Sequence, residues 1–243
     1  MIYSEADPCA ALQPYIHSYW KLKGDMQDSQ WERIFPDGRP GIVINLGDDC
    51  ITDNGQTVME HGKTYAVGAM TSFKESFIGS DTNLLGVCLK PGTFSSLYTF
   101  APQKELTNAT VEFDRRLSFD TSRIMKEGEG YLNRFFTGRM GDRDLNLQHI
   151  LDDISACRGN LNIRELASRN CTTVRQLERN FATHIGLTPK EYSSIIRLQN
   201  TMAQLEKSKA ASLSEIAFDC GYYDHAHLAN EIKKFTGLTP TQL

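Results

Sequence analysis

The sequence predicts an α+β protein of two parts. The N-terminal part is an antiparallel β-sandwich or small barrel with trailing helices, and the C-terminal part is all-α, with two helix-turn-helix units joined by a long helix. Three observations support this prediction. Short β-branched and aromatic runs alternate with turn-forming residues in the first half of the chain. Near the C-terminus a helical pattern occurs twice, and a long amphipathic segment lies between the two copies.

The strands expected in the N-terminal part are short. They lie at 32–35, 41–46, 63–68 and 84–89, and clusters of Pro, Asp, Asn and Gly separate them. Short strands separated by such turns are typical of antiparallel sandwiches and small barrels. Residues 114–136 then carry apolar side chains at helical spacing, which predicts one or two helices after the strands. We therefore expect a first domain at 1–137 and a linker at 138–146.

The domain expected at 147–243 contains an internal repeat. Gly186-Leu187-Thr188-Pro189 recurs as Gly237-Leu238-Thr239-Pro240, and the apolar positions before each copy keep nearly the same spacing. Each copy predicts two short amphipathic helices with a tight connection, which is a helix-turn-helix. The apolar pattern between Pro189 and Leu205 predicts one long helix that holds the two units at a fixed separation.

The second helix of each unit has a polar face that suits DNA. In the first unit Leu177 and Phe181 point inward, and polar side chains lie opposite, including two arginines four residues apart. Arg is the side chain that best pairs with guanine, and a helix fits the major groove. These faces carry Arg175, Gln176, Arg179 and Thr183, with Thr173 at the expected N-cap, in the first unit, and His225, Ala226, Asn230, Lys233 and Lys234 in the second.

The second unit has no arginine on this face. Asn pairs with adenine, and lysines hold phosphates as point charges. We therefore expect the first unit to contribute more of the base reading and the second unit more of the positioning. The paired histidines at 225 and 227 point in different directions on a helix, so we expect no metal site there.

Several motifs of the C-terminal part occur together and in order. They are Glu165-Leu166-Ala167, Leu177-Glu178-Arg179-Asn180-Phe181, Gly186-Leu187-Thr188-Pro189-Lys190-Glu191-Tyr192, Ile195-Ile196-Arg197-Leu198 and Ser214-Glu215-Ile216-Ala217-Phe218-Asp219-Cys220-Gly221-Tyr222. Through them, residues 147–243 resemble the DNA-binding domain of the AraC/XylS transcriptional regulators. The resemblance implies two units that enter neighbouring major-groove segments. The base contacts of the family carry over onto Arg175, Gln176, Arg179, His225, Ala226, Ala229 and Asn230.

The N-terminal part resembles a domain linked to regulators of this family, through Phe35-Pro36-Asp37-Gly38, Val67-Gly68 and the segment 86–92. The resemblance implies a sensor or oligomerisation role, often carried by a cupin-like barrel. An apolar pocket for a small-molecule effector needs aromatic walls. We expect its lining to come from Trp20, Trp31, Phe35, Tyr65 and Phe73, with core packing as the alternative for each.

The leading interpretation is a bacterial transcription regulator that binds double-stranded operator DNA and senses a small molecule or forms a homodimer. Two alternatives stay open: a constitutive regulator whose N-terminal part only dimerises or contacts RNA polymerase, and an N-terminal enzyme tethered to DNA. His17 and His61 are isolated in the sequence, and no nucleophilic side chain stands at a spacing from a basic one that is typical of a catalytic pair. We therefore expect no enzyme activity, no cofactor and no bound metal.

Composition limits the remaining possibilities. Residues 1–144 hold 15 basic against 20 acidic side chains, and residues 145–243 hold 11 against 10. Affinity for DNA then depends on a few well-placed contacts or on dimerisation rather than on net charge. The six cysteines form no CxxC pair, which argues against a zinc site. The sequence has neither a long apolar run nor a signal peptide at its start, so we expect a cytoplasmic protein with no membrane partner.

Overall fold

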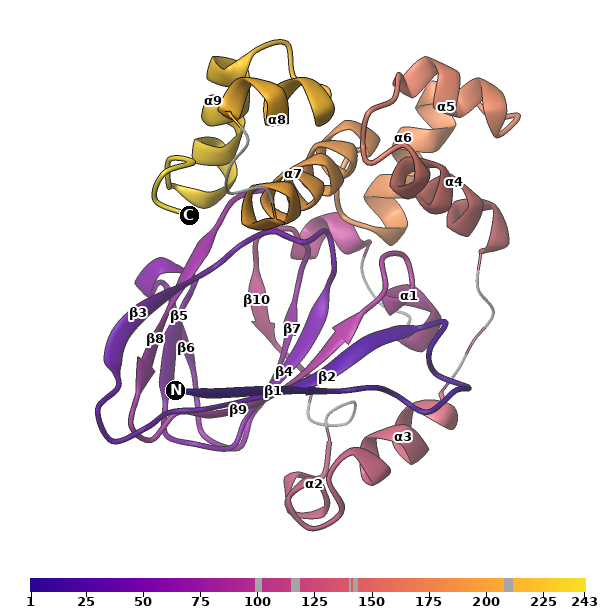
Figure 1. Cartoon of the computed structure of the whole chain (residues 1–243). Helices are drawn as coiled ribbons and strands as arrows, with labels where there is room; N and C mark the ends of the chain where they lie inside the picture. The colour runs from indigo at the N-terminus through magenta and orange to yellow at the C-terminus, as the bar shows by residue number, and fades with distance from the viewer. Residues whose placement is uncertain (99–101, 115–118, 140, 142–143, 208–211) are drawn as a thin grey trace.

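The computed structural model describes residues 1–98, 102–114, 119–139, 141, 144–207 and 212–243. Figure 1 shows the β-rich N-terminal part below and the C-terminal helices above it. This arrangement of an antiparallel β-rich part followed by a helical part confirms the predicted fold class. Among the described residues, no helix is both long and apolar enough to cross a membrane.

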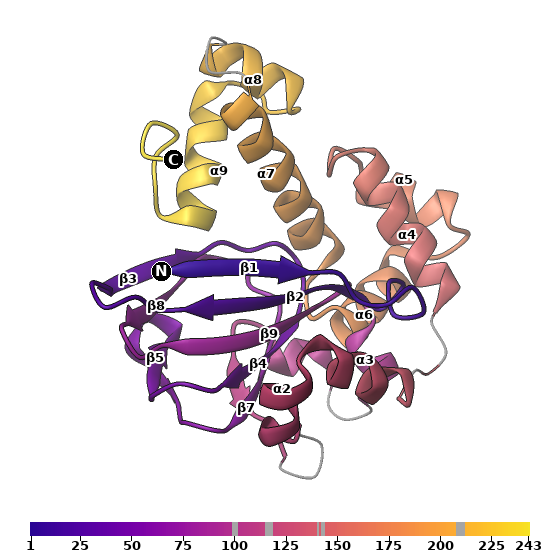
Figure 2. The same cartoon turned by 60° about the horizontal axis from the view of Figure 1, so that its bottom comes forward.

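Among the described residues, the main sheet has six antiparallel strands in the order β1-β2-β9-β4-β7-β10. Its strands are β1 (Ile2–Ala6), β2 (Ile16–Lys23), β4 (Gly41–Asn45), β7 (Thr64–Val67), β9 (Asn83–Leu89) and β10 (Thr110–Glu112). Figure 2 shows β1, β2, β9, β4 and β7 one below the other. Two smaller antiparallel sheets pair β3 (Ser29–Ile34) with β8 (Lys74–Gly79) and β5 (Cys50–Thr52) with β6 (Thr57–Met59). The short turn η1 (Asp53–Gly55) joins β5 to β6.

The predicted strands correspond to β3, β4, β7 and β9, and the other strands are additional to them. Strand β9 shows why the sheet has two different faces. Leu85 and Val87 belong to a core shared with the helices, whereas Leu84 belongs to a smaller core with Val43 and Tyr65. Successive side chains of a strand point to opposite faces, so one apolar strand serves both cores.

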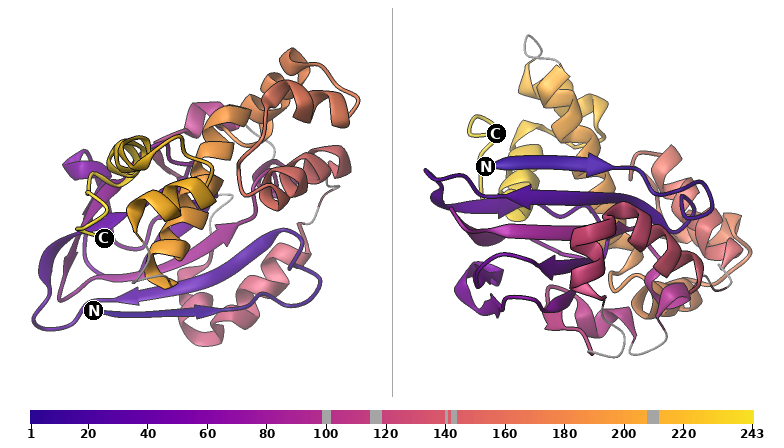
Figure 3. Two further views of the ribbon diagram at one scale, coloured as in Figure 1. Left: turned by 45° about the horizontal axis from the view of Figure 1, so that its top comes forward. Right: turned by 90° about the horizontal axis from the view of Figure 1, so that it is seen from below.

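Helices cover the face of the sheet that carries Leu85 and Val87, as both panels of Figure 3 show for α2 and α3. These elements are α1 (Phe94–Leu97), η2 (Gln103–Leu106), α2 (Thr121–Glu127) and α3 (Glu129–Thr137). Leu132 and Phe136 of α3 are fully buried there. The two helices expected within 114–136 are thus α2 and α3, and residues 115–118 lie outside the described part of the chain.

The described residues of the C-terminal part form six helices: α4 (Leu145–Ala156), α5 (Ile163–Arg169), α6 (Val174–His184), α7 (Pro189–Lys207), α8 (Leu213–Asp219) and α9 (His225–Thr236). Each of these six has a side-chain N-cap that accepts a backbone N–H. The caps are Asp144, Asn162, Thr173, Thr188, Ser212 and Asp224. Each such cap is worth about 1 kcal/mol. The helix α4 begins inside the expected linker 138–146, of which residues 140, 142 and 143 are outside the description.

The helix α7 joins the two helix-turn-helix units, α5–α6 and α8–α9. Its buried Ile195 and Leu198 share one core with Phe181 of the first unit and Ile232 of the second. An ion pair adds to this packing, because Arg197 of α7 donates two hydrogen bonds of 2.8 Å from Nη2, and one of 3.1 Å from Nε, to the carboxylate of Glu231.

The Arg197–Glu231 ion pair is largely buried, with side-chain exposures of 18% and 12%. Burial lowers the pKa of Arg197, but the hydrogen bonds and charge of Glu231 outweigh it, and the net shift is upward. The guanidinium also lies over the Tyr222 ring, 4.6 Å from its centre. The second unit is therefore fixed to α7 by a specific polar contact as well as by apolar packing.

Replacing one partner of this ion pair should destabilise the protein. Arg197→Met should lower the free energy of unfolding by about 2–4 kcal/mol, because it leaves the Glu231 carboxylate largely buried and unpaired. The double variant Arg197→Met/Glu231→Leu should recover most of the loss, since no charge is then unpaired. Urea denaturation followed by circular dichroism measures both. Equal losses in the single and double variants would contradict a role for the unpaired charge.

Candidate DNA-binding surface and N-terminal cavity

The helix α6 separates an apolar face from a polar one. Leu177 and Phe181 are fully buried, and Thr173 caps the helix by accepting the N–H of Gln176 at 3.1 Å. Of the residues expected to contact DNA in this unit, Gln176 is half-buried and the others are exposed: Thr173, Arg175, Arg179 and Thr183. The fold thus presents the predicted polar face to solvent.

Hydrogen bonds along α6 order part of this face. Arg179 donates from Nη2 to Gln176 Oε1 at 2.6 Å, and Gln176 donates from Nε2 to Asn180 Oδ1 at 2.8 Å. The amide of Gln176 is therefore held between a cation and a second amide. Pairing Gln176 or Arg179 with a base edge exchanges these bonds for bonds to DNA, so the net gain is smaller than the new bonds alone suggest.

A cation from the N-terminal part lies beside α6. Lys104 of η2 lines one groove together with Arg175 and Arg179. The C-terminal end of α6 touches the same part, since Thr107 Oγ1 donates to the carbonyl of Gly186 at 2.5 Å. Lys104 was not among the predicted DNA contacts, because it lies outside the helical repeat and only the packing of η2 against α6 brings it near.

The corresponding face of α9 is also open to solvent. Asp224 caps this helix by accepting the N–H of His227 at 2.7 Å. Of the residues expected on this face, Ala229 is half-buried and the others are exposed: His225, Ala226, Asn230, Lys233 and Lys234. The His227 ring stands edge-on to Tyr222, with ring centres 5.4 Å apart, and is thus part of the turn packing.

A cavity of about 210 Å³ lies inside the β-rich part. Its walls come from the main sheet on one side and from the smaller sheets on the other. Two of the five aromatic residues expected to line a pocket, Trp20 and Phe35, are on its wall. The indole of Trp20 lies flat against β9 because Gly86 has no side chain, and a Cβ there would be 1.8 Å from the ring.

The other three expected aromatic residues lie elsewhere among the described residues. Trp31 is 46% exposed on β3 and stands edge-on to Phe77. Tyr65 is buried in the smaller core, where its hydroxyl accepts the N–H of Glu60 at 2.7 Å. Phe73 lies beneath the guanidinium of Arg33, 4.8 Å from the ring centre. None of these three is among the residues that line the cavity, and only Tyr65 is packed in a core.

Polar residues on the cavity wall were not predicted. Lys74 Nζ lies 2.5 Å from Asp53 Oδ1, and the two side chains are only 8% and 11% exposed. Lys74 shares its strand face with Ser76 and Ile78, and this period-two pattern was the available signal for an inward lysine. The thiol of Cys88 is also on the wall, and burial raises its pKa to about 12.

The segment Pro36–Pro40 separates this cavity from α7. Asp37, Arg39 and Pro40 line the cavity, while Gln199 of α7 donates from Nε2 to the Pro36 carbonyl at 2.7 Å. On the α7 side, Arg39 also lines a smaller cavity of about 190 Å³ with His17 of the β-rich part and Tyr192 of α7. Burial and the nearby Arg39 lower the pKa of His17.

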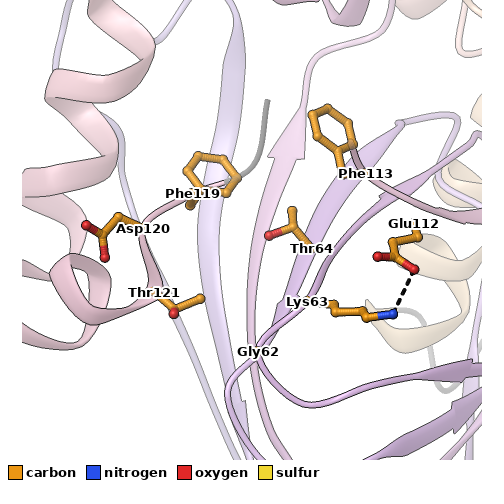
Figure 4. A pocket seen from close by; sticks show the side chains of 8 residues that line it. All are labelled: Gly62, Lys63, Thr64, Glu112, Phe113, Phe119, Asp120 and Thr121. Carbon is orange, nitrogen blue, oxygen red and sulfur yellow. Dashed lines mark hydrogen bonds and ion pairs between the residues drawn. The ribbon is translucent and has the colours of Figure 1, made fainter. Parts of the chain in front are cut away.

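A separate, open cavity of about 710 Å³ lies between β7, β10 and the start of α2 (Figure 4). Lys63 and Glu112 face each other across its floor at 3.0 Å. Hydrogen bonds to Glu60 and Glu112 raise the pKa of Lys63. Lys63 and Glu112 are thus engaged with one another, and Asp120 accepts the N–H of Arg123 as the cap of α2. In the described residues, no group of three His, Cys, Asp or Glu side chains is placed to hold a metal ion.

Two family models match the chain. Residues 4–112 match a domain of unknown function (DUF6597), and residues 166–243 match a helix-turn-helix domain. The second match covers α6 to α9 and the buried end of α5. The first covers the sheets and the cavity between them.

Curated relatives match the same C-terminal region. The transcriptional regulator ArgR of Pseudomonas aeruginosa is 31% identical over 78 residues, which are 32% of this chain and 23% of that protein. The transcriptional activator RhaS of Escherichia fergusonii is 32% identical over 78 residues, which are 32% of this chain and 28% of that protein. The chain thus spans about a quarter of the length of these relatives.

Solved structures resemble the whole fold. ToxT of Vibrio cholerae superposes with a TM-score of 0.53 and 9% identity, over 100% of this chain and 97% of ToxT. ToxT bound to an unsaturated fatty acid gives a TM-score of 0.51 and 13% identity, over 92% of each chain. Such identities show a shared fold alone. The family model and the curated relatives show that the C-terminal region of this chain is a helix-turn-helix domain of the AraC type.

Proposed function

We propose that the chain is a sequence-specific DNA-binding transcription regulator whose N-terminal part responds to a small molecule. One observation carries the DNA-binding half of this proposal: α7 joins two helix-turn-helix units whose second helices both expose polar side chains suited to base edges and phosphates. The relatives ArgR and RhaS, which are transcription regulators, support the same function.

The responsive half of the proposal rests on the segment Pro36–Pro40. One side of it lines the cavity, and its other side contacts α7. Gly38 has a φ of +75° and lies so close to Tyr192 that a Cβ would be 2.8 Å from the ring. A molecule that enters the cavity therefore meets the same short segment that supports the linker helix. The fatty acid bound by ToxT supports a ligand-binding role for this type of fold.

Removal of either arginine from α6 should weaken and broaden DNA recognition. Arg175→Ala and Arg179→Ala should each cost about 1–3 kcal/mol on the preferred site, because each removes a side chain suited to a guanine edge. Selection of bound duplexes from a random pool should give two short blocks about one helical turn apart for the wild type. In the motif selected by either variant, the base preferences within the block read by α6 should become weaker.

Arg164→Ala is the matched control for these variants. Arg164 is exposed on α5, in the same unit but outside the polar face of α6. Loss of a phosphate contact weakens binding to all sequences alike, so the enriched motif should stay unchanged in this variant. An unchanged motif and affinity in Arg175→Ala and Arg179→Ala would show that another element reads the DNA.

A substitution at Gly38 should alter DNA binding from a distance. Gly38→Ala should change the dissociation constant for the preferred site about fivefold or more, because the added Cβ pushes the Pro36–Pro40 segment away from Tyr192 and α7. Gly62→Ala is the matched control, since Gly62 has a φ of +73° but no atom within 4 Å of a Cβ. It carries the same backbone strain, about 1 kcal/mol, without the clash. Fluorescence anisotropy with labelled DNA measures both, and equal affinities would contradict the coupling.

A further inference from the structure

The inner cavity of about 210 Å³ presents the Lys74 ammonium as a donor within a mainly apolar lining. Most of its wall is aliphatic or aromatic, with Leu22, Ile42, Val43, Met59, Val67 and Leu84 among its members. One polar corner of the wall is where Lys74 of β8 meets Asp53 of η1. Burial of a charge pair among apolar side chains costs free energy unless its hydrogen bonds are satisfied, so the bonds of each partner decide what this corner can bind.

The Asp53 carboxylate is saturated. Its Oδ1 accepts from Lys74 Nζ at 2.5 Å and from Thr110 Oγ1 at 3.0 Å. Its Oδ2 accepts from Thr57 Oγ1 at 3.1 Å and from the N–H of Thr110 at 3.2 Å. Four donors thus surround a group that has about four acceptor positions.

The Lys74 ammonium is not saturated. Within the described part of the chain it has two acceptors, Asp53 Oδ1 at 2.5 Å and Thr110 Oγ1 at a long 3.5 Å. An ammonium group has three donors and no acceptor. At least one N–H therefore remains for a molecule in the cavity, and it calls for a hydrogen-bond acceptor.

The charges around the cavity disfavour an anion. Lys74 is already neutralised by Asp53, and Arg39 lies 3.3 Å from Asp37. Glu32 also lines the wall, so the lining holds three acidic and two basic side chains. A carboxylate ligand would be desolvated next to a net negative lining, whereas an uncharged acceptor avoids this cost.

The size of the cavity limits the ligand to a small molecule. An apolar cavity of about 150 Å³ takes up benzene. The cavity here measures about 210 Å³ and therefore suits one ring with a small substituent. Trp20 and Phe35 provide aromatic walls for such a ring.

We infer that this cavity binds a small, uncharged, mainly apolar molecule that carries one hydrogen-bond acceptor, such as a ring with a carbonyl group, and that Lys74 donates to that acceptor. The inference rests on the proposed function, since it names the class of molecule to which the N-terminal part responds. It differs from a transfer of the ligand of ToxT, because a fatty acid is an anion at neutral pH.

Three probes of similar size test the inference on the full-length protein by titration calorimetry at pH 7. Acetophenone has a neutral acceptor, benzoate has a charged one, and ethylbenzene has none. Acetophenone should bind about tenfold more tightly than ethylbenzene, since a bond to a charged donor adds to the apolar contacts. It should also bind more tightly than benzoate. Tightest binding by benzoate, or no measurable binding by any probe, would overturn the inference.

A variant pair assigns the preference to Lys74. The double variant Lys74→Met/Asp53→Asn removes both charges, so that neither is left unpaired, and it should bind acetophenone and ethylbenzene with nearly equal affinity. The matched control is Arg33→Met/Glu75→Gln, which removes an ion pair of 2.8 Å between β3 and β8; neither residue lines the cavity. It should keep the preference for acetophenone. Loss of the preference in the control alone would exclude Lys74 as the donor.

A third variant tests the cavity even if the double variant does not fold. Val67→Phe fills the cavity from the main sheet and should abolish binding of all three probes while near-wild-type circular dichroism confirms folding. DNA binding by the same wild-type preparation is measured in parallel. DNA binding without probe binding overturns only the ligand inference, whereas absence of both overturns the proposed function as well.

Discussion

The rigid linker helix α7 is the constraint on which the other parts depend. It buries Ile195 and Leu198 in the core shared by both helix-turn-helix units, and it holds the second unit through Arg197 and Glu231. Its outer side touches the β-rich part at Pro36 and Gly38. Because close-packed contacts resist compression, α7 cannot shift against one neighbour without changing its contacts with another.

The proposed ligand site and the proposed DNA-reading faces lie in different parts of the chain, which are nevertheless in contact. The inner cavity lies within the β-rich part, whereas the polar faces of α6 and α9 lie on the helical part. The segment Pro36–Pro40 lines the cavity on one side and contacts α7 on the other. A ligand shifts the balance between two positions of α7 only by the difference in its affinity for them. Contacts with Asp37, Arg39 and Pro40 are where such a difference would arise.

The features that the sequence predicts correctly are those whose signal comes from neighbouring residues in the chain. The two helix-turn-helix units have a 3.6-residue apolar period, and the caps Thr173 and Asp224 stand where the pattern indicates them. The cavity has no such signal, because its walls come from strands that pair across long stretches of chain. Alternation along a strand separates its two faces but does not say which face is enclosed, and therefore Trp31 and Phe73 were expected inside together with Trp20 and Phe35. The Lys74–Asp53 pair depends on how η1 folds back onto β8, which no spacing in the sequence reveals.

The contacts between the two parts are not evenly shared by the two units. The first unit meets the β-rich part directly, through Thr107 and Gly186 and through Ser95 Oγ and His184 Nδ1, 3.2 Å apart. This unit also carries both arginines expected to read bases. The C-terminal half of the chain is nearly neutral, so in the proposed function a few such contacts account for most of the specific affinity. Under the same proposal, a small displacement of the β-rich part acts on the first unit through these contacts. It acts on the second unit through α7 and through Phe73, whose ring lies beside Gly237 at the end of α9.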